Sequence, residues 1–141
     1  MDAVGIDLCE ISRIKESMKR ESFCRRILGQ REFLELQKRG FPPQSVAASF
    51  SAKEAFSKAI GTGLRGFSLC EVELLHRENG APYLHFSGKA ARLAFGKEFM
   101  VSVSHTDTLV TVIVIGKETS NGTDFGKIRP FDFKTQSTEC Q

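Results

Sequence analysis

The sequence has no tryptophan and one tyrosine among its 141 residues, although it has 12 phenylalanines. It also has no run of about 18 apolar residues, so we expect no transmembrane helix and no membrane partner. Residues 1–7 lack the basic segment and long apolar segment of a secretory signal. Together these absences predict a protein that works in the cytoplasm.

The sequence contains cysteines, but it lacks the close cysteine spacing that is typical of structural metal sites. The four cysteines are widely spaced, and no two of them form a C-x-x-C pair. This spacing favours reduced thiols over zinc ligands or disulfides. The four residues are Cys9, Cys24, Cys70 and Cys140.

The charge balance excludes few functions, but it indicates which kinds of binding partner fit the protein. A hydrophobic content of 40% and a charged content of 26% are typical of a globular protein with one core. The net charge of +3 is too small to require nucleic acid, and no aromatic-rich RNA-binding motif occurs. We therefore expect no nucleic-acid partner, while an acidic protein partner is compatible with clustered basic residues.

The pattern of residues 45–60 predicts a long central helix. Small residues recur at helical spacing and form a narrow stripe, which would let the helix backbone approach its packing partner closely. Gly61 is expected to end the helix, as glycine after the last turn commonly does. The stripe consists of Ala48, Ala52, Ala55 and Ala59.

Glu54 and Lys58 lie one turn apart on a flank of this helix. They fit an exposed ion pair, which is routine on solvated helices. They equally fit a metal-binding carboxylate beside a phosphate-binding ammonium group. The spacing alone does not decide between the two interpretations.

Residues 3–8 predict a short buried strand whose apolar run breaks at Asp7. A carboxylate at a strand end often caps the following helix or turn. It can also project into a site, because Mg²⁺ is commonly bound by one or two carboxylates together with phosphates and water. Both interpretations of Asp7 stay open at this point.

Three helical segments are predicted before the central helix, at 10–20, around Arg25, and at 30–39. The first has a buried stripe of Ile11, Ile14 and Met18. On the other side it presents basic residues, namely Arg13 and Arg20, and Arg25 follows soon after. Such residues either form a solvated face or dock an acidic protein.

The second half of the chain predicts strands. Asn79-Gly80 indicates a hairpin between strands at 72–75 and 83–86. A short helix at 88–96 precedes an alternating strand at 99–105, and 109–115 is an apolar run typical of a central strand. His105 ends the alternating strand, a place where most histidines are merely surface or hydrogen-bonded groups.

Gly61, Gly63 and Gly66 form a G-x-G-x-x-G pattern. The dinucleotide-binding fingerprint follows a strand and opens a helix, whereas this pattern follows a helix, so we reject that function. A glycine-rich turn can still bring backbone N–H groups close to a phosphate. Residues 117–141 are polar and without period, and we expect a flexible tail outside a domain formed by residues 1–116.

Three segments together resemble a known family. Residues 5–14 resemble the opening of the holo-[acyl-carrier-protein] synthases, the small 4'-phosphopantetheinyl transferases. Residues 50–63, with the sequence FSAKEAFSKAIGTG, are similar to the central signature of that family. Residues 101–105, VSVSH, are similar to its late Ser-x-Ser-His strand. The likeness covers about residues 3–116.

This resemblance implies an α+β fold with a small antiparallel sheet packed against the long central helix, and a homotrimer with active sites at the subunit interfaces. The implied reaction transfers 4'-phosphopantetheine from coenzyme A to a serine of apo acyl carrier protein, with Mg²⁺ as cofactor, for fatty acid biosynthesis. Catalytic residues would be Asp7, Glu54 and Lys58, of which Asp7 and Glu54 would bind Mg²⁺. Coenzyme A would be bound by Lys58, Gly61, Thr62, Gly63 and His105.

The resemblance also gives the basic residues a partner, since Arg13, Arg20 and Arg25 would dock the acidic carrier protein. Two other functions remain to be separated from this one. The first is a coenzyme A or nucleotide-binding module without transferase activity. The second is a small basic nucleic-acid binder, which a strongly salt-dependent interaction with random oligonucleotides would reveal.

Overall fold

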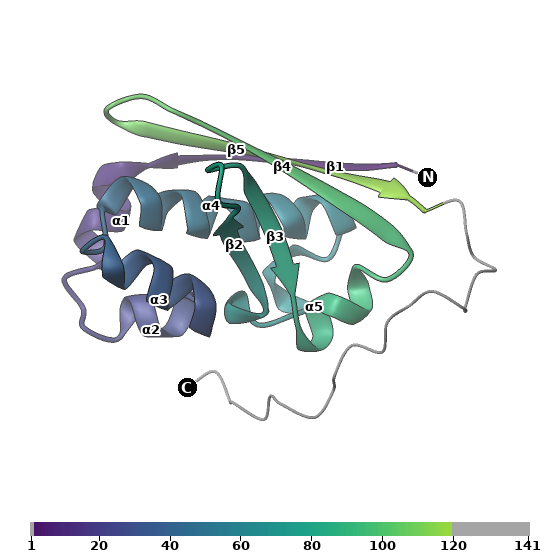
Figure 1. Ribbon diagram of the computed structural model, residues 1–141, viewed down its shortest axis with the longest axis horizontal. Coiled ribbons are helices and arrows are strands. Elements are labelled where there is room, and N and C mark those ends of the chain that lie inside the picture. Colours follow the sequence, from purple (N-terminus) through teal and green to yellow (C-terminus); the bar gives the residue numbers. More distant parts are fainter. Residues whose placement is uncertain (1, 120–141) are drawn as a thin grey trace.

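The structure is a computed structural model that describes residues 2–119 (Figure 1). The helices and strands follow in the order β1 Ala3–Glu10, α1 Ile11–Ser17, α2 Phe23–Ile27, α3 Gln30–Lys38, α4 Pro43–Ile60, β2 Val72–His76, β3 Pro82–Phe86, α5 Gly88–Leu93, β4 Lys97–His105 and β5 Leu109–Glu118. Two short 3₁₀ turns, Gly63–Arg65 and Leu69–Glu71, connect α4 to β2. Most of the predicted tail lies outside the described residues, and β5 continues to Glu118.

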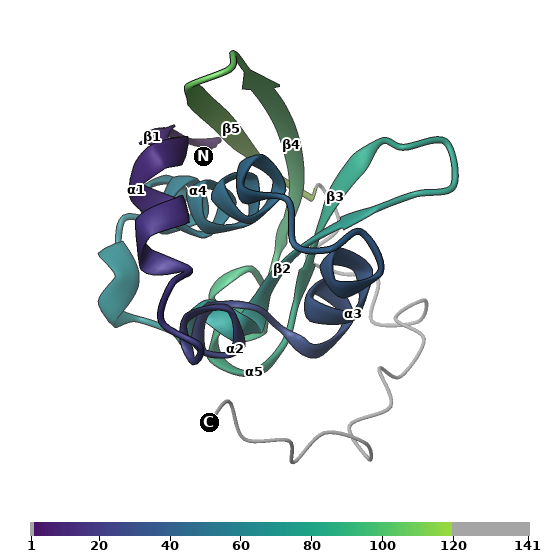
Figure 2. The same ribbon diagram turned by 90° about the vertical axis from the view of Figure 1, so that its left-hand side faces the viewer.

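The strands form two antiparallel sheets. In the larger sheet the order is β1-β5-β4, so the apolar run at 109–115 is the central strand, as predicted. Strands β2 and β3 form a separate hairpin, which projects from the body of the molecule (Figure 2). Its turn contains Asn79-Gly80, with Gly80 at a φ of 86°, and this confirms the turn predicted from the sequence.

Helix α4 lies along one face of the larger sheet and forms the centre of the fold (Figure 1). It begins at Pro43, whose missing N–H is no loss in the first turn. It ends at Gly61, which adopts the left-handed conformation with a φ of 75°. The alanine stripe is its packing face, because Ala48, Ala52 and Ala55 are all buried.

The alanines let α4 lie unusually close to β1. A Cβ atom on Gly5 would come within 1.9 Å of the carbonyl oxygen of Ala55 and 2.6 Å of the amide nitrogen of Ala59. Only glycine therefore fits at this point of β1. The close approach fixes the distance between the strand that carries Asp7 and the helix that carries Glu54.

Strand β1 differs from the prediction in two ways. It does not end near Asp7 but continues to Glu10, because Cys9 and Glu10 pair with Val110 and Leu109 of β5. It is also not buried on both faces, since alternate residues point to solvent. The outward residues are Val4, Ile6 and Leu8, which are 63%, 59% and 66% exposed.

A second apolar cluster lies beyond the C-terminal half of α4. The ring of Phe56 is fully buried and lies 4.7–5.3 Å from the rings of Phe67, Phe86 and Phe99. These contacts join α4 to the hairpin and to β4. Aromatic pairs of this kind contribute about 0.5–1.5 kcal/mol each beyond the area they bury.

Two of the four cysteines, Cys9 and Cys24, are free thiols, as predicted. Cys70 is buried, and Cys140 lies outside the described residues. No helix within residues 2–119 is long and apolar enough to cross a membrane.

Candidate functional site

A polar stripe on α4 faces Asp7 of β1. Ser51, Glu54 and Lys58 follow one another at helical spacing, three and then four residues apart. The hydroxyl of Ser51 donates to Oδ2 of Asp7 at 2.6 Å, and Nζ of Lys58 lies 3.2 Å from Oδ1. Two elements distant in sequence thus bring the two strongest candidate motifs together.

Asp7 does not cap a helix or turn. It lies inside β1 opposite Val112, and its carbonyl accepts a hydrogen bond from the hydroxyl of Thr111 at 2.9 Å. The residue before α1 is Glu10, whose side chain makes no capping hydrogen bond. Of the two interpretations from the sequence, the structure therefore supports a carboxylate that projects into a site.

Lys58 is bonded to the strand instead of forming a routine pair along its own helix. Its ammonium group contacts Asp7 and also donates to the carbonyl of Ile6 at 3.0 Å. Its side chain is 53% exposed, while that of Asp7 is 14% exposed. The ammonium group is therefore accessible to a ligand in solvent, and its attraction to Asp7 is weakened by solvent screening.

The site carries an excess of negative charge. Burial and the negative charge of Asp7 raise the pKa of Glu54, and Lys58 opposes this shift. Burial also raises the pKa of the Cys9 thiol, as do Asp7 and Glu54, while Arg13 lowers it. Two partly buried carboxylates thus lie close enough to repel each other.

This donor set fits a hard divalent cation. Carboxylate oxygens are the ligands that Mg²⁺ prefers, and Mg²⁺ usually takes only one or two of them, with water and phosphates completing its shell. A cation between Asp7 and Glu54 would relieve their repulsion. Residues 2–119 contain no group of three His, Cys, Asp or Glu side chains arranged to hold a metal.

The glycine turn follows directly on the polar stripe. Gly61, Thr62 and Gly63 are all exposed, and both glycines have positive φ, of 75° and 61°. The hydroxyl of Thr62 donates to the carbonyl of Gly63 at 2.9 Å. The turn thus places exposed backbone one turn of helix beyond Lys58.

His105 lies apart from these residues within one chain. It is exposed at the end of β4, where it helps to line an open groove with a volume of about 270 Å³. The groove adjoins the N-terminal half of α4, at Ser45 and Ala48, whereas Glu54 and Lys58 belong to the C-terminal half. A single chain does not bring His105 to the Asp7 site.

The candidate docking arginines are all exposed. Arg13 is on α1, Arg20 follows it, and Arg25 is on α2 with its guanidinium 5.1 Å from the ring centre of Phe33. The charge of Arg13 also lowers the pKa of the Cys9 thiol, and Cys9 follows Asp7 by two residues in β1.

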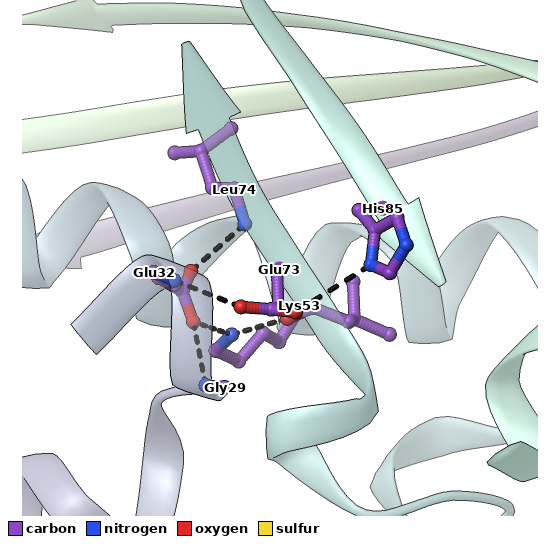
Figure 3. Close-up of polar contacts among 7 residues, drawn as sticks. Gly29, Glu32, Lys53, Glu73, Leu74 and His85 are labelled. Atoms are coloured by element: carbon purple, nitrogen blue, oxygen red, sulfur yellow. Dashed lines mark hydrogen bonds and ion pairs between the residues drawn. The ribbon is translucent and has the colours of Figure 1, made fainter. Parts of the chain in front are cut away.

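Two parts of this region were not predicted from the sequence. Ser51 belongs to the polar stripe, and its spacing from Glu54 and Lys58 was the signal that could have identified it. The second part is a buried pair, in which Nζ of Lys53 lies 2.7 Å from Oε1 of Glu32 (Figure 3). No sequence signal distinguishes these two charged residues from exposed ones.

Comparison with known proteins gives a consistent result. The family model described as the 4'-phosphopantetheinyl transferase superfamily matches residues 3–110. A holo-[acyl-carrier-protein] synthase of Fusobacterium nucleatum is 40% identical over 116 residues, which cover 79% of this chain and 95% of that protein.

Solved structures agree with the sequence comparison. The holo-[acyl-carrier-protein] synthase of Neisseria meningitidis is 30% identical with a TM-score of 0.76, and the match covers 82% of this chain and 98% of that one. The synthase of Bacillus anthracis, solved with CoA (3',5'-ADP), is 29% identical with a TM-score of 0.69, and covers 83% and 96% of the two chains. The expected α+β fold is thereby confirmed.

Proposed function

This chain belongs to the 4'-phosphopantetheinyl transferase superfamily, and from this premise we propose that it acts as a holo-[acyl-carrier-protein] synthase. It transfers 4'-phosphopantetheine from coenzyme A to a serine of apo acyl carrier protein, and the holo carrier is used in fatty acid biosynthesis. The observation that carries the proposal is the contact of Ser51 and Lys58 with Asp7, beside Glu54.

The reaction is a phosphoryl transfer, so the site must stabilise the negative charge on the phosphate groups. The serine oxygen of the carrier forms a bond to the phosphorus that bears pantetheine, and the bond from that phosphorus to the other phosphate breaks. The serine proton is released, and adenosine 3',5'-bisphosphate leaves with the electron pair. Such sites work mainly by positioning and by stabilising the charge on the phosphate oxygens.

The described residues supply these functions as follows. Asp7 and Glu54 would hold Mg²⁺, which supplies positive charge for the pyrophosphate oxygens when bound. Ser51 holds the Asp7 carboxylate in position through its hydrogen bond. Lys58 is exposed, and its ammonium group can turn from Asp7 to a phosphate oxygen of coenzyme A.

Coenzyme A is proposed to lie along the polar stripe and the turn that follows it. The exposed backbone of Gly61, Thr62 and Gly63 allows phosphate groups to approach closely. His105 completes the site from a neighbouring copy, because its groove lies at the other end of α4. A site made from two chains accounts for the distance between these groups in one chain.

A homotrimer is proposed on the strength of the outer face of the larger sheet. This face is apolar, and within residues 2–119 no helix covers it (Figures 1 and 2). Exposed apolar patches of this kind mark association surfaces. The patch is formed by Val4, Ile6, Leu8, Met100 and Ile115.

The carrier protein is proposed to dock on the exposed arginines of α1 and α2. The charge of Arg13 acts on Cys9, two residues after Asp7, and this supports a carrier position in which its serine is near the reacting phosphate. Arg20 and Arg25 extend the basic surface away from the site. Contacts of this type accelerate encounter and fix orientation more than they add affinity.

A mass measurement tests the proposal. The protein is incubated with coenzyme A, Mg²⁺ and apo acyl carrier protein, and the carrier is expected to gain the mass of phosphopantetheine. Coenzyme A binding without any mass gain would instead support the binding module that lacks transferase activity. A reaction in EDTA provides the control for the metal requirement.

A further inference from the structure

The molecule contains a buried polar network that the proposed chemistry does not use. Its centre is the ion pair of Lys53 on α4 and Glu32 on α3, and both side chains are fully buried (Figure 3). Lys53 also donates to the carbonyl of Val72. The network therefore joins α4, α3 and the start of β2.

The remaining hydrogen-bonding capacity of Glu32 is also used. Its Oε1 accepts from the amide of Gly29 at 3.1 Å, and its Oε2 accepts from the amide of Leu74 at 2.8 Å. Its own amide donates to Oε2 of Glu73 at 2.8 Å. Nδ1 of His85 lies 3.5 Å from the other oxygen of Glu73, which extends the network to β3.

Stability alone does not account for this arrangement. Removing two charges from water costs several kcal/mol per ion, and replacement of such a pair by apolar groups of similar size is often neutral or stabilising. The geometry of the network is specific, because its bonds are directional and join α4 to α3 and to the β2–β3 hairpin. A buried polar network of this kind defines orientation more than it adds free energy.

The element whose orientation needs defining is α4. Its alanine stripe and the bonds of Ser51 and Lys58 to Asp7 hold one side of the helix against β1. Lys53 anchors a different side of the helix. It is also the residue directly before Glu54, so rotation about the helix axis moves the two together.

We propose that Lys53 is a positioning residue, whose buried bonds to Glu32 and to the Val72 carbonyl hold α4 in the rotation that directs Glu54 towards Asp7. This inference rests on the proposed function, because it assigns Glu54 a role in binding Mg²⁺. Loss of the anchor lets the Glu54 carboxylate move away from Asp7. Misplacement by about 1 Å costs on the order of 10²-fold in rate, and loss of an outer support costs about 10–100-fold in metal affinity.

The test is the double variant Glu32→Gln with Lys53→Met, which removes both charges and nearly keeps both shapes. We expect an unfolding temperature close to that of the unchanged protein. We also expect that Mg²⁺, measured by calorimetry in the presence of coenzyme A, binds about 10–100-fold more weakly. The kcat should fall by a similar factor, while the KM for the carrier protein stays the same.

Val46→Ala is the matched control, because Val46 is a fully buried residue of the same helix outside the network. It is expected to lower the unfolding temperature without changing the Mg²⁺ affinity. A change in Mg²⁺ affinity in this control would mean that general destabilisation causes the effect, and it would overturn the proposal.

Lys53→Met alone is the second variant and serves if the double variant does not fold. It removes the anchor on α4 and leaves Glu32 with the amide donors of Gly29 and Leu74, and burial raises the pKa of that carboxyl so that it can take up a proton. We expect the same loss of Mg²⁺ affinity. Mg²⁺ affinity and kcat equal to those of the unchanged protein, in whichever variant folds, would overturn the positioning role. The proposed function fails separately, if the unchanged protein does not modify the carrier.

Discussion

At the scale of single residues, the central fact is that Asp7 has different partners for its two carboxylate oxygens. Ser51 bonds one oxygen and Lys58 the other, so the side chain is held facing α4. Glu54 lies in the same stripe, but its pKa is raised. The Asp7 carboxylate is thus held in place by two partners, whereas the Glu54 carboxylate is kept charged at a cost.

The first prediction concerns the removal of these carboxylates. Asp7→Ala and Glu54→Ala are each expected to lower the rate of carrier modification by about 10²–10³-fold, because the site loses several kcal/mol of charge stabilisation. The rate is measured by the mass gain of the carrier, and circular dichroism verifies the fold. Glu78→Ala, which removes an exposed carboxylate from the hairpin turn, is the control. Near-normal turnover in a folded Asp7 or Glu54 variant would refute the metal assignment.

The second prediction concerns the cost of the charge on Glu54. A raised pKa in the folded state means that folding disfavours the ionised carboxylate. This cost is present at neutral pH, and it disappears as the pH falls below the ordinary glutamate pKa of about 4.3. Glu54→Gln is therefore expected to raise the unfolding temperature by roughly 1–3 °C at pH 7, a small shift because solvent screens this half-buried group.

Calorimetry in EDTA at pH 7 and at about pH 3 measures both parts of that expectation, since the gain should vanish at the lower pH. A lower unfolding temperature for Glu54→Gln at pH 7 would show that the carboxylate stabilises the fold. In that case, repulsion by Asp7 does not govern Glu54.

At the scale of elements, the contact between β1 and α4 governs the site. Gly5 lies two residues before Asp7, and its backbone touches α4 at Ala55 and Ala59. The Glu32–Lys53 pair acts on the same helix from another side. Residues on two different sides of α4 thus hold the helix in place relative to β1.

The third prediction follows from the first of these contacts. Gly5→Ala is expected to destabilise the protein by about 3 kcal/mol or to prevent folding, because the new methyl group meets helix backbone that cannot move aside. Gly96→Ala is the comparison, since Gly96 has a positive φ of 80° but open space around it. It should cost only about 1–2 kcal/mol. Urea denaturation measures both, and equal losses would contradict the close-contact explanation.

The elements themselves were largely predictable from sequence, and the polar contacts between them were not. Gly61 and Asn79-Gly80 are local signals, and the helix end and the hairpin turn are where these residues predict them. The continuation of β1 through Cys9 and Glu10 depends on pairing with β5, about a hundred residues away. Hydrophobicity patterns also place lysine and glutamate outside by default, so Lys53 and Glu32 gave no signal.

At the scale of the whole molecule, two surfaces have different characters. The outer face of the sheet is apolar, whereas α1 and α2 present exposed arginines. The first suits another copy of the chain, and the second suits an acidic partner. Each surface leads to a separate experiment.

The fourth prediction tests the apolar face. Ile6→Glu is expected to convert the proposed trimer into monomers, because it would bury a charge in the proposed subunit contact. Sedimentation velocity measures the molecular mass. Leu34→Glu is the control, since Leu34 is 50% exposed on α3, away from the sheet. A monomeric unchanged protein, or a trimeric Ile6→Glu variant, would refute this arrangement.

The fifth prediction tests the arginines. Arg13→Glu combined with Arg20→Glu is expected to raise the KM for the carrier protein by roughly 10-fold or more, while coenzyme A affinity stays unchanged. Added salt should raise the KM of the unchanged protein too, because exposed charges are screened within about 8–10 Å at physiological ionic strength. Steady-state titration of the carrier and calorimetry for coenzyme A distinguish the two effects. An unchanged carrier KM would show that the carrier docks elsewhere.

The alternation of β1 also makes the chain sensitive to a kind of mutation other than substitution. One extra codon after Ile6 would shift all later residues of the strand by one position, and thereby exchange their faces. If Gly5 kept its place against Ala55, Asp7 would point to the outer face and lose Ser51 and Lys58. If Asp7 kept its place, a side chain would take the position of Gly5 and collide with the helix. Neither alignment of the lengthened strand therefore preserves both the packing of β1 on α4 and the contacts of Asp7.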